Sequence, residues 1–406
     1  MTLVTDLELP AFDLGEPGLV GETYHRRLAA LRARSWLAQS PIALLVLDRA
    51  AGEFFLRCRA TAFPGRQIAE LFGITAGPLF DHIDANILNL SDETHRRLRS
   101  IVNGAFTPNA ANRWRPVMQQ ILEQLWSDLE DEGRTEFVAA LAKPYPALTI
   151  ASILGAPAED APRLHDWSSW VQRQFDIRAL STDLTRIEAA VVEVNDYVET
   201  LLARPAGELS DTLLGALVAA ESEGDRLSHV ECVNLAVNVL AGAIDTTQSQ
   251  LSHALHLFAT QPDQWALLDK SPELIAAAVT EVLRVEPVTP FTARVCLEDV
   301  DYEGVVFPAG TIVAICAERG NRDCDGGEQF DIAAERDGRL LTFGAGPHYC
   351  LGANLARAEL EEALRFLAPR MPGLHLDGPV SFGGIEGIYG VETLPLRWST
   401  ATNARR

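Results

Sequence analysis

The segment FGAGPHYCLGANLARAEL, residues 343–360, places a single cysteine, Cys350, between a glycine-rich loop and the start of a helix. Glycines at 344, 346 and 352 allow a sharp turn and a close approach of the backbone to another group. From Ala353 to Ala368 apolar residues recur at helical spacing. A thiol at a helix N-terminus has a lowered pKa, so the pattern predicts a thiolate that acts as a nucleophile or as a metal ligand.

The composition excludes several classes of protein. The chain has 406 residues, of which 47% are hydrophobic and 22% charged, and this is typical of a globular protein with a large core. A net charge of −22 argues against nucleic acid and against an anionic membrane surface as partners. The start, MTLVTDLELPAFDLGEPG, has the features of neither a secretory signal nor a membrane anchor. Six scattered cysteines without a CxxC pair argue against zinc or disulfides, so we expect a cytoplasmic protein.

Helical periodicity dominates the chain, and no repeat, low-complexity tract or linker divides it. We therefore expect one domain over residues 1–406, mainly α with a small β-rich lobe. A hairpin is predicted from residues 42–48 and 53–58, further strands within 300–316, and an irregular lid loop over 75–90. Helices are predicted at 18–34, 92–103, 112–130, 137–154, 161–174, 183–202, 228–260 and 273–284.

Three interpretations of Cys350 compete. A catalytic cysteine needs a histidine base, but His348 is two residues away and such neighbours do not generally converge. A buried structural cysteine leaves the glycine pattern unexplained. A haem ligand explains more, because a thiolate pushes electron density onto iron and backbone N–H groups after Cys350 would tune the sulfur. Gly352 would then let the haem approach, and Phe343 would shield the sulfur.

The residues Phe343, Gly346, His348, Cys350 and Gly352 match the pattern Phe-x-x-Gly-x-His/Arg-x-Cys-x-Gly. In this the chain resembles the cytochrome P-450 family of haem-thiolate monooxygenases. The resemblance implies that haem b lies between the long central helix and the cysteine loop, which includes Gly344. It also implies that Cys350 is the ligand of the iron.

A second motif, Glu281-Val282-Leu283-Arg284, lies on a predicted helix some distance before the cysteine. An isolated pair at this spacing is usually a surface ion pair. The resemblance implies instead a buried structural pair that braces the cysteine side of the haem. The segment NRDCDGGEQFDI departs from the family, because Gln329 stands where an arginine is usual and leaves the third partner of the pair open.

Haem propionates need cationic partners where they are buried. Residues His95 and Arg99, four apart on one predicted helix, match a His-x-x-x-Arg that the family uses for this purpose. Arg294 and His348 resemble two further propionate partners.

The longest predicted helix contains LAGAIDTTQSQ, which aligns with the family pattern Ala/Gly-Gly-x-Asp/Glu-Thr-Thr from Gly242 onward. Oxygen activation needs protons in an otherwise dry pocket, and a hydroxyl and a carboxylate can relay them through water. Thr246 is thus expected to hold dioxygen and water, and Asp245 to gate solvent protons. Ala243 replaces the usual second glycine, which changes the shape of the oxygen groove.

The family's recognition regions align with the 75–90 loop and with a set of mostly apolar residues. These predict a hydrophobic substrate with a few oxygen functions, such as a terpenoid, steroid, fatty acid or polyketide of secondary metabolism. The predicted pocket residues are Leu240, Ile244, Val288, Phe291, Thr292, Ile388 and Tyr389.

No G-x-G-x-x-G fingerprint for a flavin or nicotinamide occurs, so electrons are expected from a separate ferredoxin and ferredoxin reductase. An acidic ferredoxin would be steered by a basic patch of Arg96, Arg97, Arg113, Arg115, Arg357 and Arg365. The expected reaction inserts one atom of O₂ into a hydrophobic small molecule, by hydroxylation or epoxidation. Two alternatives stay open: a peroxide-driven or non-oxygenating haem-thiolate enzyme, and a haem-based ligand-binding or sensor protein.

Overall fold

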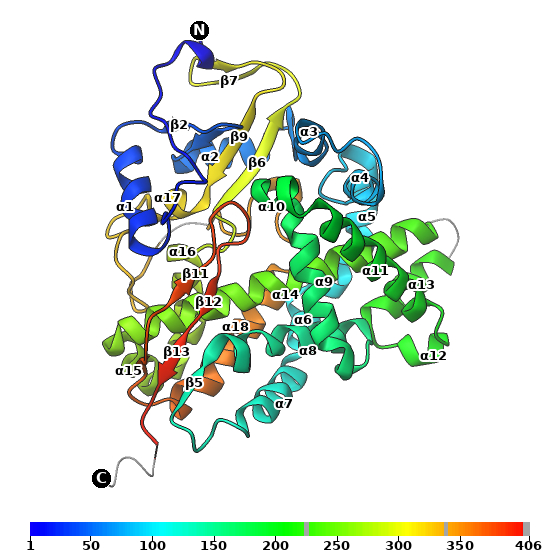
Figure 1. The fold of residues 1–406 in the computed structure, drawn as a ribbon, viewed down its shortest axis with the longest axis vertical. Helices are drawn as coiled ribbons and strands as arrows, with labels where there is room; N and C mark the ends of the chain where they lie inside the picture. Colours follow the sequence, from blue (N-terminus) through cyan, green and yellow to red (C-terminus); the bar gives the residue numbers. More distant parts are fainter. Residues whose placement is uncertain (223–226, 337–339, 401–406) are drawn as a thin grey trace.

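The computed structural model describes residues 1–222, 227–336 and 340–400 of the chain. Helices build the larger part, and a smaller β-rich lobe covers one end (Figure 1). This arrangement confirms the predicted mainly α fold with a small β lobe. The helices are α1 Gly21–Arg32, α2 Arg49–Arg57, α3 Gly65–Leu71, α4 Pro78–Ala85, α5 Asp92–Val102, α6 Pro108–Asn112, α7 Arg115–Trp126, α8 Pro144–Leu154, α9 Ala161–Gln172, α10 Ile177–Thr182, α11 Leu184–Leu202, α12 Ala206–Leu209, α13 Leu213–Ser222, α14 His229–Thr260, α15 Pro262–Lys270, α16 Ile275–Val285, α17 Ala317–Arg322 and α18 Ala353–Leu367.

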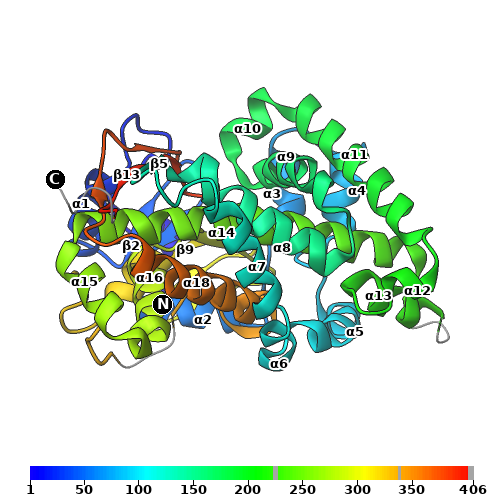
Figure 2. The same ribbon diagram turned by 90° about the horizontal axis from the view of Figure 1, so that it is seen from below.

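The 32-residue helix α14 crosses the helical part as its central strut (Figure 2). It begins with a capping box, in which the Ser228 side chain accepts from the Glu231 N–H and the Glu231 carboxylate accepts from the Ser228 N–H. Helices α8, α9 and α11 pack against it, as do α16 and α18. The predicted helix over 228–260 is confirmed, and α14 holds the apolar core of the helical part together.

The β-rich lobe is built on a five-stranded sheet in the order β2-β3-β9-β6-β4. Side chains alternate along its central strands: Leu44, Val46 and Val313 join one core cluster, while Leu45 and Ala314 join another on the opposite face. The sheet is therefore buried on both sides. Strand bounds are β1 Thr2–Leu3, β2 Leu37–Gln39, β3 Leu44–Val46, β4 Thr61–Ala62, β5 Arg134–Glu136, β6 Phe291–Cys296, β7 Val300–Tyr302, β8 Val305–Phe307, β9 Ile312–Cys316, β10 His375–Leu376, β11 Ser381–Phe382, β12 Val391–Thr393 and β13 Pro395–Arg397.

The predicted hairpin is wrong in its second half, because residues 49–57 form helix α2. Asp48 caps this helix by accepting a hydrogen bond from Ala51 N–H at 3.0 Å. The buried residues Ala51, Gly52, Phe55 and Leu56 lie on one side of the helix, where they pack against the sheet. Strand β3 pairs instead with β9, which is distant in sequence and parallel to it.

The expected irregular loop over 75–90 contains a helix, α4. Pro78 occupies its first turn, and Leu79, His82 and Ile83 are buried at helical spacing. The predicted helix over 137–154 is interrupted, since residues Val138–Ala142 form a π-helical turn before α8 starts at Pro144. None of the described helices combines the length and apolarity needed to cross a bilayer.

Candidate haem-binding active site

A cavity of about 470 Å³ lies between α14 and the segment that carries Cys350. Its wall includes Gly242, Ala243 and Thr246 of α14, together with residues of β6 and of the 385–388 loop. Phe343, Gly344, His348, Cys350 and Gly352 line the opposite side. The two sequence motifs, about a hundred residues apart in the chain, therefore face one cavity.

The loop before Cys350 needs two of its glycines for conformational reasons. Gly344 and Gly346 have φ values of 70° and 71°, in the left-handed region that favours glycine. A Cβ on Gly346 would lie 2.7 Å from the Leu56 carbonyl oxygen, so this glycine also lets the loop pack on α2. The Cys350 N–H donates to the Phe343 carbonyl oxygen at 2.9 Å, which closes the loop and leaves the cysteine facing the cavity.

The pKa of Cys350 differs from the expectation of a lowered value. Enclosure by the protein raises it, although the backbone N–H groups of Gly352 and Ala353 and the positive charge of Arg99 act in the opposite direction. The helix N-terminus alone therefore does not produce the thiolate, because loss of solvation outweighs the donors. A metal cation at the sulfur deprotonates a coordinating thiol outright.

Three cationic or ionisable groups, Arg99, Arg294 and His348, line one edge of the cavity, and His95 contacts His348 without lining the wall itself. Arg294 is 3% exposed and donates to the Ala293 carbonyl at 2.8 Å, and burial lowers its pKa to about 10. Arg99 donates to the Tyr349 carbonyl at 2.5 Å. The rings of His95 and His348 lie 4.3 Å apart between their centroids, and burial with the neighbouring positive charges lowers the pKa of His348 to about 3.

Within the described chain, neither arginine of this group forms an ion pair with a carboxylate. A buried arginine without a counter-ion is costly, so the site fits a ligand that brings negative charge. A Cβ on Gly242 or Gly352 would meet no atom within 4 Å, which leaves room on both sides for a flat group. A thiol, cationic groups and two open glycine faces are the features that a haem with its propionates requires.

On α14, Thr246 and Asp245 point in different directions. Thr246 lines the cavity, and its hydroxyl donates to the Gly242 carbonyl at 2.7 Å. The Asp245 carboxylate accepts from Ser169 Oγ of α9 at 2.8 Å and lies 3.7 Å from His165 Nε2. Burial raises the pKa of Asp245, and the Ser169 hydrogen bond opposes this shift. Asp245 thus stands behind the cavity wall rather than in it.

The predicted substrate pocket is partly corrected. Val288, Phe291, Thr292 and Ile388 line the cavity, whereas Leu240, Ile244 and Tyr389 are not in its wall. Leu240 and Ile244 are one helical turn apart on a fully buried face of α14, so both pack into the core.

Tyr389 is 1% exposed and packs against Tyr24, His253 and Phe382. Its hydroxyl accepts a hydrogen bond from the Gly21 N–H at 2.7 Å, which ties it to the start of α1. Ile388 and Tyr389 are adjacent in the chain, and the structure places only Ile388 in the cavity wall.

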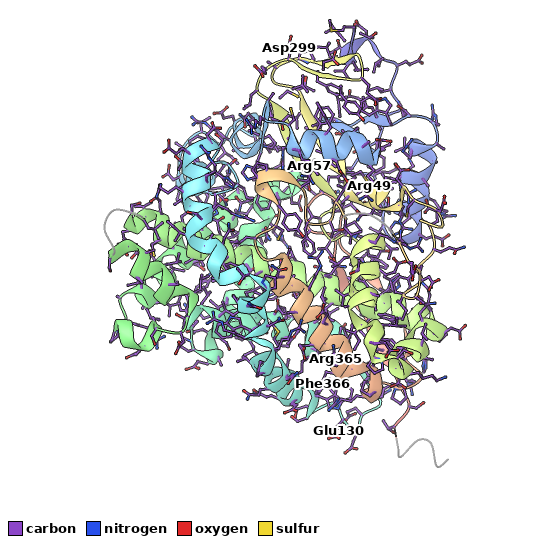
Figure 3. All side chains as sticks on the ribbon, turned by 180° about the vertical axis from the view of Figure 1, so that it is seen from behind. Arg49, Arg57, Glu130, Asp299, Arg365 and Phe366 are labelled. Carbon is purple, nitrogen blue, oxygen red and sulfur yellow. The ribbon has the colours of Figure 1, made fainter. Side chains whose placement is uncertain are left out.

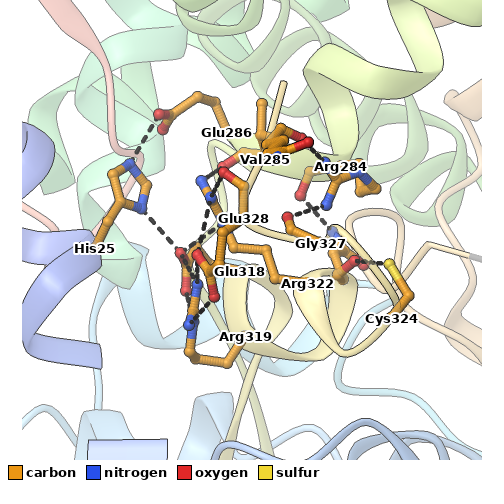
Figure 4. Close-up of polar contacts among 12 residues, drawn as sticks. His25, Arg284, Val285, Glu286, Glu318, Arg319, Arg322, Cys324, Gly327 and Glu328 are labelled. Atoms are coloured by element: carbon orange, nitrogen blue, oxygen red, sulfur yellow. Dashed lines mark hydrogen bonds and ion pairs between the residues drawn. The ribbon is translucent and has the colours of Figure 1, made fainter. Parts of the chain in front are cut away.

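The Glu281–Arg284 pair is buried, as the sequence motif implies. Arg284 donates to Glu281 through two bonds of 2.7 and 2.8 Å and to the carbonyls of Gly327 and Gln329 at 2.6 Å. Arg336, at 3.4 Å from Glu281, occupies the place of the third partner that Gln329 does not fill. Figure 4 shows Arg284 beside a second cluster in which His25 bridges Glu286 and Glu318.

Six carboxamide side chains in the cavity wall were missed in the sequence. Asn and Gln are common on exposed helix faces, and no motif singles these out. They are Asn86, Asn89, Gln172, Gln174, Asn238 and Gln250. In the described residues, no cluster of three or more His, Cys, Asp or Glu side chains is arranged to hold a metal ion, so Cys350 would act as a single protein ligand.

Three of the six arginines in the predicted basic patch contact glutamates or an aromatic ring in the structure. Arg97 pairs with Glu231, Arg115 pairs with Glu361 and Glu362, and Arg357 lies over the Phe343 ring at 4.6 Å. Arg96, Arg113 and Arg365 remain exposed. Arg57, at the end of α2 and next to the loop of Gly346, is exposed as well, and Figure 3 shows Arg57 and Arg365 on the face where α18 runs.

Comparison with known proteins agrees with this geometry. The family model described as Cytochrome P450 matches residues 270–367. The luteothin monooxygenase of Streptomyces thioluteus is 34% identical over 97% of this chain and 97% of its own length. The cytochrome P450 monooxygenase PikC of Streptomyces venezuelae is 31% identical over 80% of this chain and 78% of its own.

Among solved structures, CalO2 superposes with a TM-score of 0.88 and 30% identity, covering 96% of this chain and 99% of the other. Chains at this identity and coverage share their fold and haem-binding architecture, and the named relatives are monooxygenases. The chain therefore belongs to the cytochrome P450 family of haem-thiolate monooxygenases.

Proposed function

We propose that residues 1–406 form one domain that binds haem b through Cys350 and oxygenates a hydrophobic small molecule in the cytoplasm. One atom of O₂ enters a C–H bond or an alkene of the substrate. The other atom leaves as water, after the supply of two electrons and two protons. When bound, the haem supplies the chemistry of oxygen activation. The observation that carries the proposal is the convergence of Cys350 with unpaired cationic groups on one cavity.

Each residue at the proximal side has a role in this proposal. The Cys350 sulfur ligates the iron, and the N–H groups of Gly352 and Ala353 moderate its basicity. Phe343 covers the sulfur, and Arg357 stacks on the Phe343 ring. Gly344 and Gly352 give the loop its shape and leave the haem face open.

The propionates would be held by Arg99, Arg294, His95 and His348. Arg294 is well suited to this role because it is buried and has no counter-ion in the described chain. Charge-assisted hydrogen bonds from these groups would offset the cost of burying the two carboxylates.

On the distal side, Gly242 leaves space above the haem and Thr246 presents a hydroxyl to the cavity. Asp245 would take protons from solvent and pass them toward Thr246. To do so it must leave Ser169, because its carboxylate is turned toward α9. The cavity wall from Val288 to Thr292 and at Ile388 would hold the apolar part of the substrate.

Electrons would come from a ferredoxin and its reductase. Arg57 lies next to the loop of Gly346, and Arg57, Arg96, Arg113 and Arg365 are exposed on a chain with a net charge of −22. Such a surface steers an acidic partner to the proximal face. The double variant Arg57→Glu/Arg113→Glu should slow reduction by ferredoxin at low salt, while Arg34→Glu, an exposed arginine after α1, should not. Equal rates of reduction by ferredoxin in the two variants would contradict this docking surface.

The decisive experiment is the carbon monoxide difference spectrum of the dithionite-reduced protein. Wild type should give a strongly red-shifted Soret band that Cys350→Ala loses and the control Cys324→Ala retains. Retention of the band in Cys350→Ala would refute the ligation. Turnover with hydrogen peroxide, but none with NAD(P)H, reductase and ferredoxin, would favour the peroxide-driven alternative.

A further inference from the structure

Several carboxamide side chains of the cavity wall form hydrogen bonds with described residues at their NH₂ end and none at their carbonyl end. Four of them donate their NH₂ group to a backbone carbonyl of their own neighbourhood. Asn89 donates to Ile83 at 2.8 Å, Gln174 to Val171 at 2.9 Å, Asn238 to Asn234 at 2.7 Å and Gln250 to Glu286 at 2.9 Å. Because a backbone carbonyl can only accept, each bond identifies which end of the amide is the NH₂ group.

The opposite ends of these amides are acceptors without a donor. No described residue donates to the carbonyl oxygens of Asn89, Gln174, Asn238 or Gln250, and those of Asn89 and Gln250 are completely shielded. Gln174 and Gln250 are 6% and 3% exposed. A buried acceptor without a partner destabilises the protein, so a ligand that donates to it gains binding energy. Because the carbonyl oxygens of Asn89 and Gln250 are shielded, those of Gln174 and Asn238 are the two of these four acceptors that a ligand can reach.

The charged groups in the cavity wall further limit which chemical class of ligand can bind. Its two arginines, Arg99 and Arg294, stand with His348 at the Cys350 end, where the haem propionates would lie. Glu386 at the wall accepts from Arg178 at 2.5 Å. Burial raises the pKa of Glu359 on α18 well above its usual range, which disfavours its anion. The Glu359 carboxyl has no partner in the described chain, but it lies on α18, the helix that follows Cys350, and so shares the haem side of the cavity with Arg99 and Arg294. Along α14, the described residues of the wall offer no charged group to a substrate carboxylate or ammonium.

The positions of the acceptors set the length of the ligand. Helices α9 and α14 run antiparallel, since His165 contacts Gln248 at 2.5 Å and Ser168 contacts Ala241 at 3.0 Å. Gln174, just after α9, therefore lies toward the Asn238 end of α14. Asn238 precedes Thr246 by eight residues, or about 12 Å along the helix, whereas Gln250 follows it by one turn.

We infer that the substrate is an uncharged, largely apolar molecule that carries at least one hydroxyl group as a hydrogen-bond donor. This hydroxyl binds at Gln174 and Asn238, about 12 Å along α14 from the reacting position. This inference rests on the proposed oxygenation in the same cavity, and it excludes free fatty acids from the substrate classes that the sequence left open.

The test compares four probes of one chain length on the wild-type holoenzyme at neutral pH. They are 1,12-dodecanediol, 1,12-dimethoxydodecane, dodecanoic acid and 1,12-diaminododecane. Binding is measured by the haem spin-state shift and independently by the rise in the melting temperature. The diol should bind about tenfold more tightly than the ether, which has the same oxygens but no donors. The acid and the diamine should bind more weakly than the diol.

Two variants test where the hydroxyl binds. Gln174→Leu and Asn238→Leu should each reduce the preference for diol over ether, while Gln120→Leu, an exposed glutamine of α7, should keep it. Equal binding of diol and ether by wild type overturns the inference, as does tighter binding of the acid or the diamine, or no binding of the diol. These outcomes come from wild type and do not depend on the folding of a variant. A diol that binds with the preference but is never oxidised would contradict the proposed function and leave the inference intact.

Discussion

Ser169 Oγ donates a hydrogen bond of 2.8 Å to Asp245 Oδ1, and this bond holds the carboxylate against α9 instead of in the cavity. Thr246, the next residue, lines the cavity. A proton that passes from one to the other must therefore cross the face of α14. Side-chain motion of Asp245, or water between the two residues, has to complete the path.

Replacement of Asp245 tests this path. We expect Asp245→Asn to lower kcat about a hundredfold, because an amide cannot transfer a proton. The control Asp263→Asn alters an exposed carboxylate and should leave kcat unchanged. Ser169→Ala removes a bond that lowers the pKa of Asp245, so the acid limb of kcat should move to higher pH. An unmoved limb in Ser169→Ala would show that Asp245 does not limit turnover.

Disruption of the Glu281–Arg284 pair should destabilise the protein strongly. Glu281→Gln leaves a nearly fully buried guanidinium without its charge partner, and such losses cost about 3–5 kcal/mol. The matched control is Glu70→Gln, which breaks the half-exposed pair with Arg66 and should cost less than about 1 kcal/mol. Denaturant unfolding of both variants gives the two free energies. Similar values would contradict the bracing role.

The cluster around His25 should make stability depend on pH. Glu286 and Glu318 raise the pKa of His25 to about 9 against its desolvation, and His25 helps to lower the pKa of Glu286 to about 2. A raised histidine pKa stabilises the fold fully below its unfolded value near 6.5, and this contribution is lost as the pH rises to about 9. A lowered glutamate pKa stabilises above 4.5 and is lost as the pH falls to about 2.

Wild type should therefore lose up to about 3 kcal/mol of unfolding free energy between pH 6.5 and pH 9 through His25. His25→Gln should be flatter in this window. His375→Gln, which changes a histidine on the exposed strand β10, should keep the wild-type slope. The measurement is denaturant unfolding across the pH range. A wild-type slope in His25→Gln would assign the dependence to other groups.

Space at Gly242 should be needed for the haem and not for folding. A Cβ there meets no atom within 4 Å, so Gly242→Leu should fold with an unchanged melting temperature as apoprotein. Its side chain would occupy the volume against α14, and haem content per chain should fall. Gly104→Leu, at an equally open position away from the cavity, should bind haem normally. Full haem content in Gly242→Leu would place the cofactor elsewhere.

The correction to the substrate pocket can be tested by a pair of variants. Leu240→Ala should cost about 2–5 kcal/mol of stability, because Leu240 is fully buried, and should leave substrate-induced spectral shifts unchanged. Thr292→Val changes the cavity wall and should alter those shifts at little cost in stability. Denaturant unfolding and spectral titration distinguish the two effects. Altered spectral shifts in Leu240→Ala would place Leu240 in the substrate pocket.

The sequence was sufficient to predict those parts of the site that a single loop or helix forms. The loop before Cys350 requires glycine at 344 and 346 because of its backbone angles, and the capping box marks the start of α14. Apolar residues at helical spacing predicted most of the helices. These features depend on residues within a few positions of one another, so they can be recognised in the linear chain.

Contacts between distant elements decided the rest. Residues 53–57 have the composition of a strand, but the Asp48 cap and packing on the sheet make them helical. Leu240 and Ile244 lie on the same helix as Thr246, yet the packing of α14 turns them into the core. Arg97 and Arg115 are engaged by glutamates more than a hundred residues away.

The carboxamides of the cavity wall combine both cases. Asn89, Gln174 and Asn238 donate to carbonyls within six residues, whereas Gln250 donates to Glu286, 36 residues away. Only the fold placed their free ends around one cavity. The sequence by itself determined the helical framework and the class of reaction, and it predicts Cys350 as the haem ligand. The tertiary structure decided which groups are free to meet the substrate, because hydrogen-bond partners and burial are properties of residues brought together from separate parts of the chain.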